Sequence, residues 1–313
     1  MARINARQVS RGGSRRSRAG RPARRRIVAW LAAGAVVMTA TAGCDVNSAL
    51  QRLSDARHLA ASLHVQFTKA SDVANRAVMA DTDERSSAFA REAEQATAAA
   101  QKDAEALASL LENLGYSNEL ALLQEFRTRF SEYQKMERTI LELAVENTNL
   151  KAQRLSFGSA QEAADAFRDV LDALMPLDAA KDAWHVKALA ATAVAHVREI
   201  QVIQAPHIAD PDDAQMTQME KQMSTSEAAA RSALKDLAPI VRPLSRPQLS
   251  SAGAALDRFM EINAQIVGLS RRNTNVRSVA LSLNQKAKLT AECETSLRAL
   301  QDALGKRGFT GTR

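Results

Sequence analysis

Residues 143–156, with the sequence LAVENTNLKAQRLS, recur as LSRRNTNVRSVALS at residues 269–282. Six of the fourteen positions are identical, and the triplet Asn-Thr-Asn stands at the same place in both. The acidic, turn-like segments 80–84 and 209–213 precede these stretches in the same order. Self-similarity of this kind indicates an internal repeat. The sequence therefore predicts a tandem duplication, with one copy over residues 46–175 and the other over residues 178–304.

The composition around both triplets favours helices. From Cys44 to Met175 there is no proline, and glycine occurs only at Gly115 and Gly158. Alanine, leucine, glutamate, glutamine and arginine dominate this stretch, and all five are strong helix formers. The alternation of apolar and polar residues that is typical of strands is absent. The predicted fold class is all-α.

Turn residues divide each copy into four expected helices. In the first copy the breaks fall at residues 81–84, at 115–118 and at Gly158, where Ser159 and Glu162 form a capping-box pattern. The second copy is expected to contain helices over 178–205, 212–238, 246–286 and 287–304. Short loops between long helices make neighbours antiparallel. We therefore expect two tandem four-helix up-and-down bundles, followed by a flexible tail at 305–313.

An arginine-rich arm precedes the helical part. Residues 1–26 contain ten arginines and no acidic residue, and we expect them to be disordered. Residues 27–43, IVAWLAAGAVVMTATAG, contain no charge. Such a run behind basic residues is typical of a signal peptide or a membrane anchor, and the positive charge before it places everything after Gly43 outside the cytoplasm. The expected location is the cytoplasmic membrane, with the body on its extracytoplasmic (periplasmic) side.

The apolar run ends in Thr41-Ala42-Gly43-Cys44. Small residues before a cysteine resemble a bacterial lipoprotein cleavage site, and this resemblance implies cleavage before Cys44 and acylation of Cys44. The alternative is an uncleaved single-span anchor with Cys44 at the membrane edge. Only Cys293 remains besides Cys44. A lone cysteine on a helix favours a buried small side chain, and a disulfide with Cys44 or an intermolecular pair are the alternatives.

The basic charge belongs to the arm rather than to the body. The chain has 42 Lys and Arg against 35 Asp and Glu, a net charge of +7. Without the ten arginines of residues 1–26, 32 basic residues face 35 acidic ones, which is a net charge of −3. A nucleic-acid-binding domain carries its basic charge on its own surface. We therefore expect no nucleic-acid partner.

The Asn-Thr-Asn triplets are the most specific candidate site. Apolar side chains around them follow spacings of three and four residues, which form one helix face, and Asn147 and Asn273 fall on that face. A buried amide must find hydrogen-bond partners. One interpretation is a polar layer that fixes helix register, and the other is a polar patch that contacts a small ligand. The candidate residues are Asn147, Thr148, Asn149, Asn273, Thr274 and Asn275.

The motifs of common enzymes and metal sites are missing from the sequence. It contains no Gly-rich phosphate loop, no nucleophile elbow and no Glu-x-x-His pair. His185, His196 and His207 are spaced by eleven residues, which is about 16 Å along a helix and too far for one metal ion. We expect no metal, no cofactor and no enzymatic activity.

An arginine-led apolar segment followed by long helices, with ILELAVENTNLKAQRLSFG at residues 140–158, resembles the four-helix-bundle sensory module of methyl-accepting chemotaxis receptors. The resemblance covers residues 46–175 and, more weakly, 178–304. It implies an extracytoplasmic domain that senses small molecules or a binding protein, often as a dimer. That module normally lies between two membrane spans and has a cytoplasmic output domain, whereas here no second span follows residue 43.

Two functions follow as expectations. The first is a sensory or ligand- or partner-binding protein without its own output domain, held to the membrane by residues 27–43 or by acylated Cys44. Its expected partners are another membrane signalling protein and a second copy of the chain. The second function is a structural envelope scaffold or spacer lipoprotein that binds no small molecule.

Overall fold

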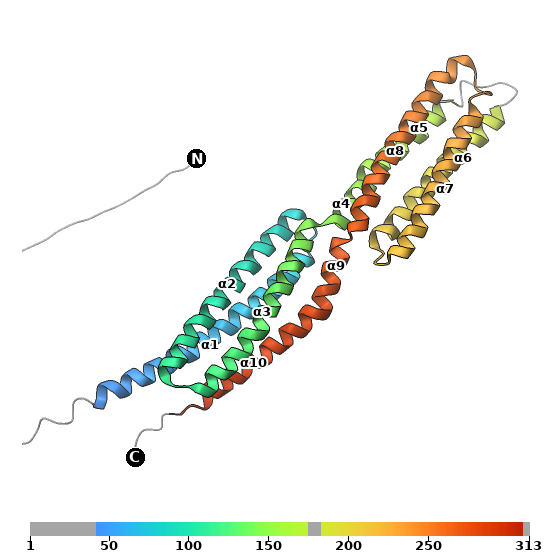
Figure 1. Cartoon of the computed structure of the whole chain (residues 1–313). Helices are drawn as coiled ribbons and strands as arrows, with labels where there is room; N and C mark the ends of the chain where they lie inside the picture. The colour runs from blue at the N-terminus through green and yellow to red at the C-terminus, as the bar shows by residue number, and fades with distance from the viewer. Residues whose placement is uncertain (1–41, 175–182, 309–313) are drawn as a thin grey trace, which may run out of the picture. The chain divides into compact units, whose positions relative to one another are not determined.

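The computed structural model describes residues 42–174 and 183–308, and these residues are helical almost throughout (Figure 1). The prediction of an all-α fold is confirmed, and no strand occurs in either described range. The long helices are α1 (Ala42–Val78), α2 (Asp83–Leu114), α3 (Ser117–Glu146), α5 (Gln161–Leu174), α6 (Ala183–Ala209), α7 (Asp213–Leu237), α8 (Arg246–Arg272) and α10 (Ala287–Lys306). Shorter elements are α4 (Thr148–Leu155), α9 (Thr274–Leu281), the π-helical turns η1 (Ser156–Ala160) and η3 (Ser282–Lys286), and the 3-10 turn η2 (Pro243–Ser245).

Helix boundaries follow local capping chemistry. Thr82 begins α2, because its hydroxyl accepts the backbone N–H of Arg85. Gly115 ends that helix with a φ of 68°, a left-handed conformation that glycine adopts without steric cost. At the start of α7 the carboxylate of Asp212 accepts the backbone N–H of Ala214. The acidic turns of the two repeats are therefore helix caps.

Buried apolar side chains form two large cores. The first core combines side chains from α1, α2, α3 and α10, and the second core combines side chains from α5, α6, α7 and α8 with Ala152 and Ala160 from the segment before α5. Each core thus takes three helices from one sequence repeat and one helix from the other. The expected ranges 46–175 and 178–304 describe the order of helices along the chain, whereas the cores group those helices differently.

The reason for this grouping is that the expected breaks at Gly158 and after Lys286 do not occur. Residues 156–160 and 282–286 form π-helical turns that lead directly into α5 and α10. The helices break instead at Asn147 and Asn273, which adopt φ angles of 54° and 53°. Asparagine tolerates this left-handed conformation better than other non-glycine residues. A single glycine inside a helix costs only about 1 kcal/mol relative to alanine, so Gly158 does not end the helix.

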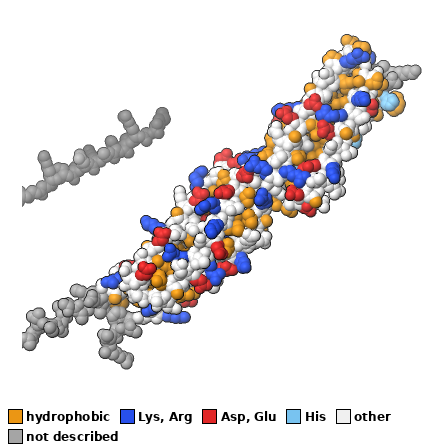
Figure 2. Space-filling view, viewed as in Figure 1, with side chains coloured by type: hydrophobic (Ala, Val, Ile, Leu, Met, Phe, Trp, Pro, Cys, Tyr) orange, Lys and Arg blue, Asp and Glu red, His pale blue; other side chains and the backbone are white. Residues whose placement is uncertain are grey.

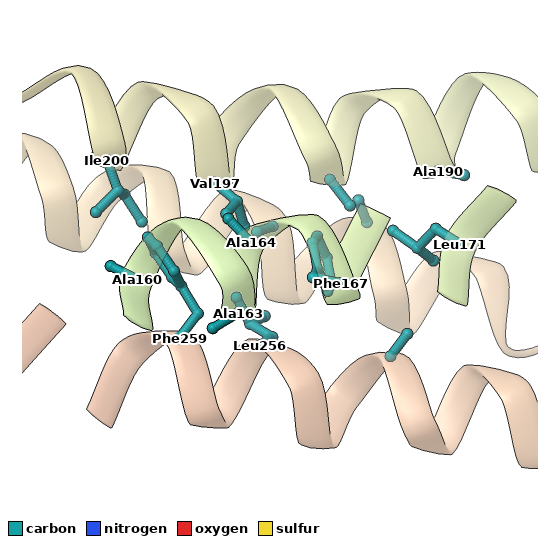
Figure 3. Close-up of a cluster of buried hydrophobic side chains, with 14 of the residues drawn as sticks. Ala160, Ala163, Ala164, Phe167, Leu171, Ala190, Val197, Ile200, Leu256 and Phe259 are labelled. Atoms are coloured by element: carbon teal, nitrogen blue, oxygen red, sulfur yellow. The ribbon is translucent and has the colours of Figure 1, made fainter. Parts of the chain in front are cut away.

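Aromatic content distinguishes the two cores. In the first core the ring of Phe67 lies 5.9 Å from Phe126, 5.9 Å from Phe130 and 5.0 Å from Tyr133, centroid to centroid. Figure 3 shows the second core, where Phe167 and Phe259 pack among alanine, leucine, valine and isoleucine side chains. Small side chains allow helices to approach closely, and large rings fill the space where they do not.

Two other helix ends differ from expectation. Pro206 lies inside α6, which continues to Ala209 rather than ending near residue 205. The helix α10 reaches Lys306, so Gly305 belongs to it and not to a flexible tail. The side chain of Cys293 is fully buried and the thiol is free, which confirms its interpretation as a small core residue.

Several expectations concern residues outside the described ranges. The arm at 1–26, residues 27–41 of the apolar run and the side chain of Cys44 lie outside them, as do residues 309–313. Val46–Arg313 forms one compact unit. Within 42–174 and 183–308, no helix combines the length and the apolar character needed to cross a membrane. Figure 2 shows basic and acidic side chains interspersed over the visible face of these helices.

Candidate functional site

The two Asn-Thr-Asn triplets meet each other where α3 passes into α4 and α8 passes into α9. The backbone N–H of Thr148 donates to Oγ1 of Thr274 at 3.0 Å, and the backbone N–H of Thr274 donates to Oγ1 of Thr148 at 3.2 Å. The backbone N–H groups of Asn149 and Asn275 likewise each donate to the other's Oδ1 at 3.1 Å. The partners in each of these pairs lie 126 residues apart, the same separation that relates the triplets in the sequence. We call these six residues the asparagine joint.

The side-chain amides of the joint bridge the two helix breaks. Nδ2 of Asn275 donates to Oδ1 of Asn147 at 2.6 Å, and Nδ2 of Asn149 donates to Oδ1 of Asn273 at 2.8 Å. Asn149 also donates to the carbonyl of Ile208 at 2.6 Å. The structure therefore brings all six predicted residues together in one hydrogen-bonded layer.

One group of the joint is unsatisfied. Nδ2 of Asn147 is buried without a hydrogen-bond partner among the described residues. Its counterpart, Nδ2 of Asn273, donates to the carbonyl of Asp210 at 2.8 Å. The pairing of the joint's other side-chain groups with one another favours the interpretation of the joint as a register-fixing layer.

A second polar cluster lies inside the first core, beside a groove between α1 and the η3–α10 segment. The groove has a volume of about 620 Å³, within the range of small-molecule sites. Its lining residues are Ser71, Asn75, Val78, Met79, Val279, Ser282, Leu283, Lys286, Ala287, Thr290, Ala291 and Glu294. We call it the Lys286 groove.

Lys286 is the one basic residue that lines the groove, and it is almost completely buried. Its ammonium group donates to the backbone carbonyl of Ser71 at 2.9 Å and to Oδ1 of Asn75 at 2.8 Å. The hydroxyl of Ser282 donates to the same Oδ1 at 2.9 Å. A protonated lysine has three N–H donors. Two of them are used by Ser71 and Asn75.

A buried carboxylate completes the cluster behind Lys286. Oε1 of Glu137 accepts the hydroxyl of Tyr133 at 2.7 Å, and Oε2 accepts the hydroxyl of Thr97 at 2.6 Å. The ring of Tyr133 lies 6.0 Å from the Lys286 ammonium. The cluster thus joins one buried cation and one buried anion through an aromatic alcohol.

Burial dominates the acid–base properties of these groups. Desolvation lowers the pKa of Lys286 to about 8, against the opposing influence of the negative charges of Glu137 and Asp72. Desolvation also raises the pKa of Glu137, although the hydroxyls of Thr97 and Tyr133 work in the other direction. Both groups are therefore easier to neutralise than their exposed counterparts, which is the physical mark of many ligand-binding and catalytic groups.

The corresponding place in the second core is neutral. At the 126-residue separation, Lys286, Glu137 and Tyr133 correspond to Ala160, Asn263 and Phe259. The hydroxyl of Ser156, which corresponds to Ser282, donates to Oε1 of Gln204 at 2.7 Å. Nε2 of Gln204 then donates to Oδ1 of Asn263 at 2.8 Å. An amide relay thus replaces the charged cluster.

The helices beside this relay are also bridged. Burial aligns α1 with α6, because Ala70, Ala74 and Val78 correspond to Ile200, Gln204 and Ile208, and Ser71 then corresponds to Gln201. Nε2 of Gln201 donates to Oε1 of Gln161 at 3.1 Å, across the space that Ser71 and Ala287 leave open in the first core.

A second bridge lies beside the first. Arg198 pairs with Asp165 at 2.6 Å, and Asp165 corresponds to Ala291, another lining residue of the Lys286 groove. The groove therefore exists where small residues replace bridging ones.

Sequence reasoning missed the Lys286 cluster. Its residues are scattered over α1, α2, α3 and the η3–α10 segment, and the break expected after Lys286 placed that lysine at a helix end. One signal was present in the repeat itself, because a lysine stands where the other copy has Ala160. A charge at a position that is apolar in the sister copy indicates a specialised site.

His207, one of the three histidines whose spacing argues against a shared metal ion, is a further buried polar residue. It is fully buried, with Nδ1 2.8 Å from the hydroxyl of Ser270 and Nε2 2.9 Å from Glu220, which also pairs with Arg271 at 2.6 Å. These partners satisfy both ring nitrogens. In the described ranges no group of three or more His, Cys, Asp or Glu side chains is arranged to hold a metal ion.

No protein-family model matches this chain, and no curated protein matches it either.

Proposed function

We propose that the chain is an extracytoplasmic, membrane-anchored sensory protein that binds a small ligand in the Lys286 groove. The observation that carries this proposal is the contrast between the two cores: one has an open groove beside a buried ammonium, and the other has bridged helices and an amide relay. A buried charge is costly to keep. The second core shows that the same arrangement of helices is built without that charge.

The architecture proposed with this function is a duplicated four-helix unit. Each copy contributes its first three helices to one core and passes its fourth helix through the asparagine joint into the other core. The resemblance of residues 140–158 to chemoreceptor sensory modules supports a sensing role. In this proposal another membrane signalling protein or a second copy of the chain reads the ligand-bound state.

The test of binding is a thermal-shift screen of small molecules on the full chain. A ligand that binds only the native state adds RT ln(1 + [L]/Kd) to stability, about 2.7 kcal/mol at a hundredfold excess over Kd. The matched variant is Ser71→Gln with Ala287→Gln, which places in the first core the two glutamines that bridge the second. Stabilisation by a compound in the wild type and not in this variant supports the proposal.

The competing function is a structural spacer without a ligand, and it predicts a different outcome of the same screen. No compound would then raise the melting temperature, and the double glutamine variant would behave like the wild type apart from its own stability. That pattern would remove the sensory proposal and favour the scaffold.

Membrane attachment has its own test. Incorporation of labelled fatty acid that is abolished by Cys44→Ala supports acylation, and fractionation with the membrane in both forms supports an uncleaved anchor at residues 27–43. If both the wild type and the variant stay with the membrane and neither is labelled, acylation is excluded and only the uncleaved anchor remains.

A further inference from the structure

The lining of the Lys286 groove has a polar part and an aliphatic part. The polar part centres on the buried Lys286, whose ammonium donates to the carbonyl of Ser71 and to Oδ1 of Asn75. The aliphatic part includes the buried Val78, the half-buried Val279 and the exposed Ala291. A ligand that matches this lining has a polar head at one end and an apolar body at the other.

The mouth of the groove carries exposed apolar surface. Met79 and Leu283, both lining residues, are 76% and 71% exposed. Large apolar side chains next to a groove indicate a surface that a partner covers. An aliphatic chain that follows the groove outward would bury part of these two side chains, and this burial of apolar surface would favour binding.

The head group is defined by charge. Lys286 is the one cation among the lining residues of the groove, and its hydrogen bonds to Ser71 and Asn75 use two of its three N–H donors. Glu137 and Asp72 influence Lys286 from behind, and Glu294 lies at the groove and pairs with Arg298 at 2.7 Å. These negative charges oppose a multiply charged anion, so one negative charge is what the site accommodates.

From this chemistry we propose that the groove binds an amphiphilic monoanion with a straight aliphatic chain, of the fatty-acid type, with its carboxylate on the Lys286 ammonium and its chain against Val279 and Leu283. This inference rests on the proposed function and names the ligand class of the same site. It also predicts a direction with pH. Since the site needs a protonated lysine, affinity falls as alkaline pH deprotonates Lys286 in the presence of Glu137, Asp72 and Glu294.

The experiment is isothermal titration of the full chain with decanoate, kept below its micelle-forming concentration, and with 1-decanol as the neutral ligand of equal chain length. We expect decanoate to bind at least tenfold more tightly than 1-decanol. Lys286→Met should remove that preference, whereas Lys288→Met, an exposed lysine on the same helix, should leave it unchanged. Lys286→Ala is the second variant, because Ala160 occupies the corresponding position of the second core.

The aliphatic part is tested at the mouth. Leu283→Ser should weaken decanoate binding about threefold or more, and Phe157→Ser is its matched control, since Phe157 is 73% exposed at the corresponding position beside the second core. Equal binding of decanoate and 1-decanol, unchanged by Lys286→Met, would overturn the anionic head group while the ligand-binding function stands. Absence of decanoate binding, with some other compound blocked by the double glutamine variant, would overturn the ligand class alone. Absence of any ligand would overturn both.

Discussion

The two cores solve the same packing problem with opposite polar interiors. In the first core a buried lysine, a buried glutamate and a tyrosine share a cluster beside an open groove. In the second, a serine, a glutamine and an asparagine form a neutral relay between bridged helices. Neutral amides are far cheaper to bury than charges. The second core thus shows that the fold needs only neutral polar groups at this place. The buried lysine and glutamate of the first core are additional to what the fold needs.

The asparagine joint is the reason why the two cores can be compared position by position. Because each fourth helix crosses the joint, the same kind of segment enters both cores, η1 with α5 in one and η3 with α10 in the other. Residues at equal positions of these segments lie at equivalent places in the two cores, so Lys286 can be compared directly with Ala160.

The largest expected effect tests whether the cores depend on each other. Phe67→Ala removes a ring that contacts three other aromatic rings, and we expect it to lower the free energy of unfolding by about 3–5 kcal/mol. Since α5 and α10 link the cores, amide exchange should accelerate in α6 and α7 as well as in α2. Hydrogen-exchange mass spectrometry measures this.

The control for that variant is Phe157→Ala, which truncates an exposed ring and should change stability by less than about 0.5 kcal/mol. If Phe67→Ala accelerated exchange in α2 alone and left α6 and α7 protected, the two cores would be energetically independent. The exchange of fourth helices would then have no thermodynamic consequence.

The next effect concerns the joint. Asn149→Ala removes a side-chain amide that donates to Ile208 and Asn273 and accepts the backbone N–H of Asn275. Leaving these buried groups unpaired costs about 1–3 kcal/mol each, and we expect a total loss of about 3–4 kcal/mol because the groups share one layer. Asn275→Ala removes two side-chain hydrogen bonds instead of three and should cost less. Urea denaturation of the two variants compares them, and equal losses would contradict the asymmetry of the layer.

The sequence was sufficient for some of these features. Helix-forming composition predicted the all-α fold, and the repeated Asn-Thr-Asn triplet predicted a polar layer whose six residues do meet. The sequence was insufficient to predict where the helix breaks. Gly158 and Ser159 look like a stop signal, yet the chain continues through a π-helical turn and breaks at Asn147, where a tertiary hydrogen-bond layer stabilises the left-handed conformation.

The grouping of helices was beyond sequence reasoning for a related reason. A break at Gly158 would fold α5 back onto the helices of its own repeat. With the break at Asn147, the helix continues through Gly158, and α5 packs in the other core. Both alternatives bury the same apolar face, including Phe167 and Leu171. Periodicity shows which face is buried, but not which partner helix covers it.

The pH dependence of stability gives a third test of the comparison. The pKa of Lys286 is about 8 in the folded chain and its unperturbed value is 10.5, so the unfolded chain binds more protons between these values. Stability contributed by this group therefore rises as pH increases from 8 towards 10.5 and is constant below 8. At about 1.36 kcal/mol per pKa unit, the rise is of order 3 kcal/mol over the full window.

The measurement is the difference in urea denaturation between wild type and the triple variant Tyr133→Phe, Glu137→Asn, Lys286→Ala, at pH 7, 8, 9 and 10. This variant carries the residues of the second core, Phe259, Asn263 and Ala160. We expect it to fold, to be at least as stable as the wild type at pH 7, and to lack the alkaline rise. A rise of equal size in both proteins would show that Lys286 is not its source.

The smallest expected effect on stability concerns Ser156 and Ser282, which occupy corresponding positions in the two polar clusters. Ser156→Ala removes the hydroxyl that donates to Oε1 of Gln204, and no other described residue donates to that oxygen, so we expect a loss of about 1–2 kcal/mol. Ser282→Ala removes the matching hydroxyl from Oδ1 of Asn75, but Lys286 still donates there at 2.8 Å, so the expected loss is only about 0.5 kcal/mol.

The energetic coupling between Lys286 and Ser282 tests whether both side chains donate to the same oxygen of Asn75. In a Lys286→Met background, Asn75 loses its second donor, and Ser282→Ala should then cost about as much as Ser156→Ala does in the wild type. A double-mutant cycle by urea denaturation measures this change. If Ser282→Ala cost the same with and without the lysine, Lys286 would not share the amide oxygen. The first core would then contain the neutral arrangement of the second with an unrelated charge beside it.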